Sequence, residues 1–495
     1  MDGPSHLRLR LPAGEIVGRT EGGVAAFFGI PYAAPPAGDR RFAPPVPPEA
    51  WTGTRDCTAP GPNAPQRTRA LPGLDAAPLI GTGWAEGDDY LTLNIWRPAG
   101  DAAGLPVMVF INGGGFLVGS KDASVQAGAT FARDGVVCVA INYRLGIDGF
   151  LPIPGVPTNL GLRDMLAALA WVRDHIAVFG GAPDNITVFG ESAGAMAIAD
   201  LITSPLAKGL FRRAIVQSGH GGMTRDIGVA QRLVRKLARR LHTTPDRTGF
   251  ARIAPGDALD AVERVSLPTT RLDLRNPDGR EPVFGISRFI PVHGDDVLPE
   301  QPLDALMHGA GAEIDVLIGS NAEEMNLYLI PTGARDKVGR ALAWLLMRRS
   351  QPKAWAVLKA YGLQKDKPGP VLARALSDLV FRWPARRFAE EHRGRTWMYE
   401  FDWRSPRYGG ALGAAHGMEL PFVFDSLATA TGPEGLLGEA PPQALADRIH
   451  RLWVRFATDG SLPWPEFTRQ ARHVHQLAAD RTVEEPPMPA ARFLP

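Results

Sequence analysis

Short apolar runs alternate with longer amphipathic segments along much of the chain. Runs of a few consecutive apolar residues, rich in Val, Ile and Phe, are typical of strands buried on both faces of a parallel sheet. Such runs predict strands at 107–111, 136–143, 186–189, 214–217, 314–318 and 396–401. Periodic apolar positions predict helices at 162–179 and 443–458, the second ending at Asp459-Gly460. The alternation predicts the α/β class, with a large, mostly parallel sheet covered by helices on both faces.

The predicted strands draw on most of the 495 residues, and no Gly/Ser linker, low-complexity tract or internal repeat interrupts them. Although this length allows two or three domains, we expect a single domain over residues 1–495, because large α/β enzymes often keep one sheet. The segments 226–283 and 327–384 have a helical, loop-rich pattern. We expect them as helical excursions at the carboxyl ends of the strands, where open α/β sheets bind ligands.

Charge is nearly balanced along the chain as a whole. Lys and Arg total 54 and Asp and Glu total 52, which gives a net charge of +2. No strong field therefore favours nucleic acid or an anionic membrane as a partner, and the substrate is expected to be a small molecule without high charge. The composition does not indicate whether the protein is a monomer or an oligomer.

Cysteine usage and the amino-terminal segment bear on the compartment. Cys57 and Cys138 are too few for a disulfide framework in a chain of this length. Residues 1–16 contain no apolar stretch typical of a signal peptide or membrane anchor. We therefore expect a cytoplasmic location.

The strand predicted at 186–189 runs directly into Gly190-Glu191-Ser192-Ala193-Gly194, followed by small residues that favour a helix. A serine between two glycines on a sharp strand-to-helix turn is typical of a nucleophile elbow. The glycines remove Cβ atoms that would collide with the strand and the helix. The helix amino terminus then directs unpaired N–H groups toward negative charge that develops on a bound carbonyl.

A serine nucleophile needs a base, and the base needs an orienting acid. His416 lies in a loop after the strand at 396–401 and is a candidate base. Glu323 and Glu324 follow the strand at 314–318, and the residues alone do not choose between them as the acid. The strand at 107–111 ends in three glycines at 113–115, where backbone N–H groups can reach an oxyanion without obstruction by side chains.

With these motifs the chain resembles the type-B carboxylesterases, the α/β-hydrolases that include cholinesterases, bacterial para-nitrobenzyl esterases and bacterial phenylcarbamate hydrolases. The resemblance spans nearly the whole chain. It is carried by FGIPYAAPP at 28–36, RF at 41–42, DYLTLN at 89–94, INYRLG at 141–146, AWV at 170–172, FGG at 179–181, VQSG at 216–219, and Trp453 with FA at 456–457.

The resemblance implies an α/β-hydrolase fold and the hydrolysis of carboxylic esters through an acyl-enzyme, without a metal or other cofactor. It implies Ser192 as nucleophile, Glu324 as acid and His416 as base. The remaining implied roles are an oxyanion hole formed by Gly114, Gly115 and Ala193, and support of the triad by Glu191, Ser218 and Glu419. A carbamate or amide hydrolase with the same triad is the main alternative. A non-catalytic adhesion module of the same fold is disfavoured by the intact triad.

Several positions depart from the family pattern. The cysteine pair that closes an early loop in the family falls at Ala64 and Tyr90, and the joint loss agrees with a reducing compartment. Asn112, Ala182 and Met325 stand where the family has a histidine, an acidic residue and a glycine. These changes affect loops around the site and leave the triad intact.

The substrate pocket is only weakly encoded in the sequence. Apolar or aromatic residues that flank the motifs are expected to form its walls, and they favour a neutral, apolar ester with an aryl group. The candidates are Trp84, Phe116, Leu117, His220, Phe289 and Phe381.

Overall fold

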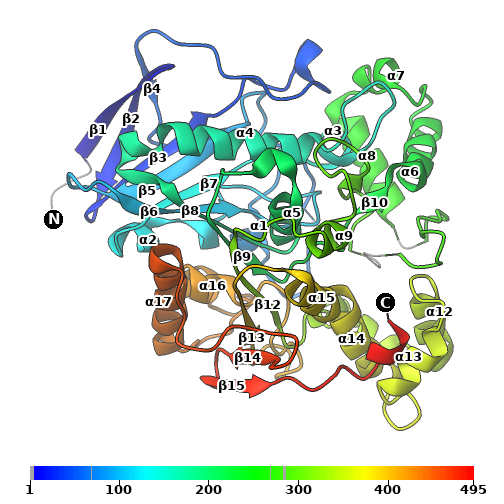
Figure 1. Cartoon of the computed structure of the whole chain (residues 1–495). Coiled ribbons are helices and arrows are strands. Elements are labelled where there is room, and N and C mark those ends of the chain that lie inside the picture. Colours follow the sequence, from blue (N-terminus) through cyan, green and yellow to red (C-terminus); the bar gives the residue numbers. More distant parts are fainter. Residues whose placement is uncertain (1–4, 69, 268, 282–285, 495) are drawn as a thin grey trace.

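A large twisted sheet forms the centre of the computed structural model, which describes residues 5–494 except 69, 268 and 282–285 (Figure 1). Its strands are β1 Ser5–Leu11, β2 Gly14–Glu21, β3 Val24–Pro31, β4 Thr54–Asp56, β5 Thr92–Pro98, β6 Leu105–Ile111, β7 Val137–Ile141, β8 Gly181–Glu191, β9 Arg213–Gln217, β12 Asp315–Asn321, β13 Thr396–Phe401, β14 His473–Gln476 and β15 Arg481–Glu484. Outside this sheet, β10 Arg225–Asp226 and β11 Val292–His293 form a separate parallel pair.

Within the described residues the sheet has 13 strands in the order β1-β2-β3-β5-β7-β6-β8-β9-β12-β13-β14-β15, with β4 beside β2. Pairing is parallel from β7 to β14. The strands β1, β2, β3 and β5 extend one side of the sheet by antiparallel pairing, and β15 does so on the other side. The predicted α/β class with a mostly parallel sheet is confirmed, and all six predicted strands are present.

Helices surround the sheet. They are α1 Ala77–Ile80, α2 Ala129–Arg133, α3 Gly146–Phe150, α4 Leu160–His175, α5 Ala193–Thr203, α6 Ile227–Arg240, α7 Arg247–Ala251, α8 Pro255–Ser266, α9 Pro302–Met307, α10 Asn326–Leu329, α11 Ala334–Lys337, α12 Arg340–Arg348, α13 Ala354–Ala360, α14 Pro368–Ser377, α15 Trp383–Glu391, α16 Leu420–Val423 and α17 Gln443–Asp459. None of the helices in the described chain is long and apolar enough to cross a membrane.

Alternating side chains of β6 show how both faces of the sheet are covered. Val107 and Val109 belong to an apolar cluster with residues of α4 and α5, whereas Met108 and Phe110 belong to a second cluster with α2, α16 and α17. Figure 1 shows α4 and α17 on opposite sides of the sheet. Because successive strand side chains point to opposite faces, a continuous apolar run is required where both faces are covered.

Helix ends follow the sequence signals with small shifts. The helix predicted at 162–179 is α4, Leu160–His175, and continues as a 3₁₀ turn over Ile176–Phe179. The helix α17 ends at Asp459, where Gly460 adopts the left-handed conformation with φ of 70°. The excursions at 226–283 and 327–384 contain α6 to α8 and α10 to α14 with the start of α15. That the chain forms a single domain stays a prediction.

The register of the parallel strands brings their carboxyl ends to one edge. Ile111 of β6 pairs with Gly190 of β8, and Glu191 pairs with Gln217 of β9. Gln217 in turn pairs with Gly319 of β12. The loops that follow β6, β8, β9, β12 and β13 therefore meet above this edge, and they carry most of the candidate site residues.

Candidate active site

Ser192 stands on a strained turn between β8 and α5. Its backbone has φ of 55° and ψ of −124°, a conformation that residues other than glycine rarely adopt. The flanking glycines allow this turn to press against β6, since a Cβ at Gly190 would lie 2.6 Å from the Ile111 carbonyl oxygen and one at Gly194 would lie 2.0 Å from it. The Ser192 N–H donates to the Gln217 carbonyl at 2.9 Å. Close packing therefore holds the elbow predicted from the sequence.

The glycine loop after β6 leaves backbone donors unused. Gly114 and Gly115 have φ of 103° and 64°, and a Cβ at Gly114 would lie 2.1 Å from the Val118 carbonyl oxygen. Both glycines line the same cavity as Ser192. Within the described chain, the N–H groups of Gly114, Gly115 and Ala193 donate no hydrogen bond. They are available to a negatively charged oxygen next to Ser192.

His416 and Glu324 meet although 92 residues separate them. His416 Nδ1 lies 2.6 Å from Glu324 Oε2. The other carboxylate oxygen of Glu324 accepts hydrogen bonds from Ser218 Oγ and from the backbone N–H of Asn321, each at 2.7 Å. Three contacts thus orient the carboxylate, and the carboxylate orients the imidazole.

Glu323 has a different environment from its neighbour. Its carboxylate accepts the N–H of Ala414 at 2.7 Å and forms an ion pair with Arg404, and a quarter of its side chain is exposed. Glu323 thus anchors the start of the loop that carries His416. Of the two adjacent carboxylates, the structure places only Glu324 against the imidazole.

A second carboxylate lies at the other side of the imidazole. Glu191 Oε1 is 3.1 Å from His416 Nε2, without the angle of a hydrogen bond. No hydrogen bond joins Nε2 to Ser192 in the described chain; such contacts are often formed only when substrate binds. The rings of Phe381 and Tyr328 flank the imidazole, with centroids 4.7 Å and 5.7 Å from it.

The two carboxylates determine the protonation of His416. Burial alone lowers the pKa of His416, but the negative charges of Glu191 and Glu324 outweigh it and raise this pKa to about 9. Burial raises the pKa of Glu191 to about 8, although the charge of His416 opposes the shift. The imidazole therefore holds its proton to higher pH than an exposed histidine does.

Removing the charge of Glu191 is expected to shift the pH dependence of ester hydrolysis. In Glu191→Gln the imidazolium loses a stabilising carboxylate, so the pKa of His416 falls. Because the neutral imidazole is the base, the acidic limb of the kcat/KM profile should move to lower pH by about 1–3 units. Steady-state hydrolysis of a soluble ester measured across the pH range checks this.

Glu323→Gln is the matched control, because it removes a nearby carboxylate that does not contact His416. The acidic limb of the kcat/KM profile of Glu323→Gln should lie at the same pH as that of the unmodified protein. An unmoved limb in Glu191→Gln would contradict the electrostatic role assigned to Glu191.

Glu419 supports the site from behind. It accepts hydrogen bonds from Asn321 Nδ2 at 2.6 Å and from Gln217 Nε2 at 3.2 Å, and Trp453 Nε1 donates to Gln217 at 3.0 Å. Burial raises the pKa of Glu419. Asn321 and Gln217 were not among the predicted site residues. Both lie at strand ends, and Gln217 also belongs to the VQSG segment at 216–219 that carries the family resemblance.

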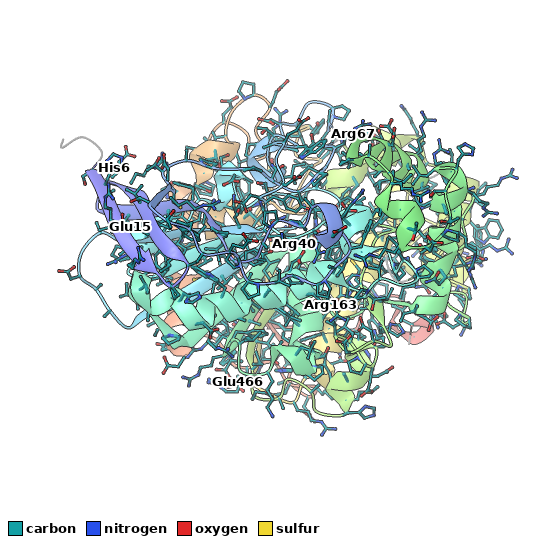
Figure 2. All side chains as sticks on the ribbon, turned by 90° about the horizontal axis from the view of Figure 1, so that it is seen from above. His6, Glu15, Arg40, Arg67, Arg163 and Glu466 are labelled. Carbon is teal, nitrogen blue, oxygen red and sulfur yellow. The ribbon has the colours of Figure 1, made fainter. Side chains whose placement is uncertain are left out.

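The cavity beside Ser192 and His416 has a volume of about 350 Å³. Tyr328, which the sequence analysis did not select, supplies an aromatic wall. Most of the other lining side chains are aliphatic: Leu71, Leu79, Ile80, Leu117, Val118, Leu259, Val262, Ile286, Leu327 and Leu420. Arg67 lies at the edge of this cavity beside the helices of the 226–283 excursion, where it forms ion pairs with Asp260 and Glu263 of α8 (Figure 2).

The predicted pocket walls are placed differently from expectation. Of the six candidates, Leu117 lines the cavity and the other five do not. Phe116 packs on Phe150 with ring centroids 4.3 Å apart, and Phe381 lies against His416. His220 contacts the Val380 carbonyl and the Gly222 N–H, while Phe289 is fully buried in the core and Trp84 is half-buried elsewhere. Proximity to a motif in sequence does not decide where a side chain points.

No group of three His, Cys, Asp or Glu side chains in the described chain is arranged to hold a metal ion. The chemistry available to the arrangement is a serine next to a buried imidazole and carboxylate, with unused N–H donors, in an apolar cavity. These are the parts needed for acyl transfer.

Comparison with known proteins gives consistent matches. The sequence pattern described as "Carboxylesterase family" matches residues 5–488. The chain is 35% identical over 519 residues to the para-nitrobenzyl esterase of Bacillus subtilis (strain 168), covering 98% of this chain and 97% of that protein. It is 35% identical over 477 residues to the phenmedipham hydrolase of Pseudarthrobacter oxydans, covering 92% of each. The crystal structure of a Geobacillus stearothermophilus carboxylesterase at pH 6.2 matches with a TM-score of 0.81 and 33% identity, covering 97% of this chain and 98% of that one.

Proposed function

The chain belongs to the carboxylesterase family and is a carboxylic ester hydrolase with the α/β-hydrolase fold, and from this premise we propose that it cleaves neutral, apolar esters through an acyl-enzyme on Ser192. The observation that carries the proposal is the 2.6 Å contact between His416 Nδ1 and Glu324 Oε2 at the cavity that Ser192 lines. Buried contacts of this kind hold an imidazole in the tautomer that can accept a proton from serine.

In the proposed mechanism His416 Nε2 takes the proton of Ser192 Oγ, and the oxygen attacks the ester carbonyl. The N–H groups of Gly114, Gly115 and Ala193 stabilise the negative charge on the carbonyl oxygen. The protonated His416 then donates its proton to the leaving alcohol. In the second stage His416 takes a proton from water, which attacks the acyl-enzyme, and then returns this proton to Ser192 as the carboxylic acid leaves. Glu324 stabilises the imidazolium during both acylation and deacylation.

The cavity supports the choice of substrate. Most of its walls are aliphatic and favour uncharged groups, because a charge placed against them loses hydration. Arg67 and Glu263, which also line the cavity, already form an ion pair with each other. Its size of about 350 Å³ suits a small molecule. The relatives include a para-nitrobenzyl esterase and a phenmedipham hydrolase. We therefore propose esters with an aryl group as the preferred substrates, and carbamates cleaved by the same triad as the second candidate class.

A cytoplasmic location is also part of the proposal. Cys57 and Cys138 are both free and buried, which agrees with a reducing compartment.

Parallel hydrolysis assays test this function. Short-chain aryl esters, long-chain esters and phenylcarbamates are compared by kcat/KM before and after treatment with a fluorophosphonate. We expect the short-chain aryl esters to be the best substrates, and stoichiometric labelling of the peptide that contains Ser192 to abolish turnover of all three classes.

Other outcomes change the proposal in defined ways. Higher kcat/KM for phenylcarbamates would replace the ester preference with the carbamate alternative. Turnover that survives complete labelling of Ser192 would contradict the acyl-enzyme. If the protein neither reacts with the probe nor hydrolyses any substrate, the enzymatic proposal is contradicted and the non-catalytic adhesion module is favoured.

A further inference from the structure

Basic charge is concentrated in one short segment of the chain. Residues 334–367 contain nine Lys and Arg against two Asp, whereas the other residues contain 45 Lys and Arg against 50 Asp and Glu. Between Arg340 and Lys359 there are five basic residues and no acidic one. The balanced charge of the whole chain therefore conceals a local positive field, which the expectation of no membrane partner did not take into account.

Exposed apolar side chains lie in the same segment. In the described chain nine large apolar residues are exposed, and three of them fall within 14 positions: Leu342 at 43%, Leu345 at 49% and Trp355 at 44%. Leu342 and Leu345 are three residues apart on α12 and so share one face of it. Clusters of exposed apolar residues on a soluble domain are typical of interaction surfaces.

The helices α12 and α13 are attached to the body of the protein by the faces that lie opposite their exposed residues. Ala343 and Met347 of α12 and Val357 and Leu358 of α13 are buried in the apolar core, and both helices pack on α14. Figure 1 shows α12 and α13 at the periphery of the molecule, away from the central sheet. The inner faces of α12 and α13 therefore pack on the apolar core, and their outer faces are exposed to solvent.

The basic side chains of this outer surface are not neutralised. Arg348, Lys353 and Lys359 are exposed, and none of them forms an ion pair with a described residue. Arg348 lies over the Trp344 ring at 5.2 Å, and Lys359 lies over the Trp355 ring at 5.8 Å. Cations and apolar groups are thus interleaved rather than separated.

We propose that this surface, the α12–α13 patch of Leu342, Leu345, Arg348, Lys353, Trp355 and Lys359, docks the protein on an anionic lipid surface. Leucine and tryptophan side chains insert into the boundary between headgroups and acyl chains, and Lys and Arg pair with anionic headgroups. Each such basic side chain strengthens binding by about fivefold. The contact is peripheral and requires no membrane-spanning helix.

Other occupants fit the patch less well. A second copy of the chain, seated on the same patch, would bring like charges together, which disfavours a symmetric dimer. Nucleic acid would use the cations but leave the two exposed leucines without partners. The patch lies outside the active-site cavity, so the proposal does not rest on the proposed ester chemistry.

Co-sedimentation with vesicles tests the proposal. The full chain should pellet with vesicles of phosphatidylcholine and phosphatidylserine and remain in the supernatant with phosphatidylcholine alone. The triple variant Arg348→Glu, Lys353→Glu, Lys359→Glu should lose at least about 100-fold in affinity. The variant Leu342→Ser, Leu345→Ser, Trp355→Ser keeps the charge and should lose at least about 10-fold, because apolar insertion is removed.

The helix α6 provides a matched control. Its basic face includes the exposed Arg235, Arg239 and Arg240 but no exposed large apolar residue. The variant Arg235→Glu, Arg239→Glu, Arg240→Glu changes the net charge equally and should keep its affinity within about fivefold of the unmodified chain. Hydrolysis of a soluble ester should be unchanged in all three variants, which verifies that each one folds.

Three outcomes would overturn the proposal. The unmodified chain could fail to pellet with anionic vesicles. The α6 variant could lose as much affinity as the charge variant of the patch, which would reduce the effect to overall charge. The Leu/Trp variant could bind vesicles normally while an acidic peptide displaces the unmodified chain, which would assign the patch to an acidic protein.

Discussion

Replacing Ser192 by alanine is expected to lower kcat for a para-nitrophenyl ester by about 10³- to 10⁶-fold. Without the hydroxyl no acyl-enzyme forms, and the remaining turnover depends on the N–H groups of Gly114, Gly115 and Ala193 acting on attack by water. Residual catalysis of this kind keeps the loss finite. The measurement is steady-state release of para-nitrophenol at saturating substrate.

The fold should survive this change. Within the described chain the Ser192 hydroxyl makes no hydrogen bond, and its removal leaves the strained backbone of the turn unaltered. The midpoint of thermal unfolding should therefore stay close to that of the unmodified protein. Ser204→Ala, at the other end of α5, removes a buried hydroxyl that has no hydrogen-bond partner among the described residues, and it should keep full turnover. Near-normal turnover in Ser192→Ala would refute the nucleophile assignment.

Exchange of Glu324 for glutamine is expected to lower kcat by about 10³- to 10⁴-fold, whereas the same exchange at Glu323 should leave kcat within about threefold. A glutamine at 324 cannot stabilise the imidazolium, and its amide can hold the imidazole in the wrong tautomer. Glu323 interacts with Arg404 and the Ala414 N–H instead, so its exchange affects the loop and not the base. Both variants are compared on one soluble ester.

The pair of variants is informative because the two residues are adjacent and chemically identical. Loss of the partly exposed Arg404 ion pair costs about 1 kcal/mol or less, so Glu323→Gln should unfold close to the normal temperature. A greater loss of kcat from Glu323→Gln than from Glu324→Gln would reverse the assignment of the acid.

Much of the fold followed from local patterns. The strands β6, β7, β8, β9, β12 and β13 were predicted because each is a run of apolar residues that only a sheet covered on both faces can bury. The end of α17 followed from Gly460, which adopts a left-handed conformation at low cost. The 3₁₀ turn at Ile176–Phe179 was included in the preceding helix, because both structures continue the same spacing of apolar residues.

The site was predicted less evenly. Residue patterns alone left Glu323 and Glu324 open, and resemblance to the family chose Glu324. The structure places Glu324 at His416 because β12 and the loop after β13 lie side by side at the sheet edge. The places of Tyr328 and Asn321 in the site were not predicted, because a helical tyrosine or a strand-end amide has no distinctive signal in sequence. Gln217 lies in the VQSG segment that carries the resemblance, but that segment did not indicate its hydrogen bond to Glu419.

Local order along the chain was sufficient to predict the elbow at Ser192, the glycine loop and the alternating strands, because each depends on conformational preferences of a few neighbouring residues. The tertiary structure decided that Glu191, which the family resemblance implies as a support of the triad, lies at the Nε2 side of His416. It also decided that Phe116 and Phe381 do not line the cavity and that Leu342, Leu345 and Trp355 are exposed. The direction of a side chain depends on register and packing between segments far apart in the chain, and no local pattern contains that information.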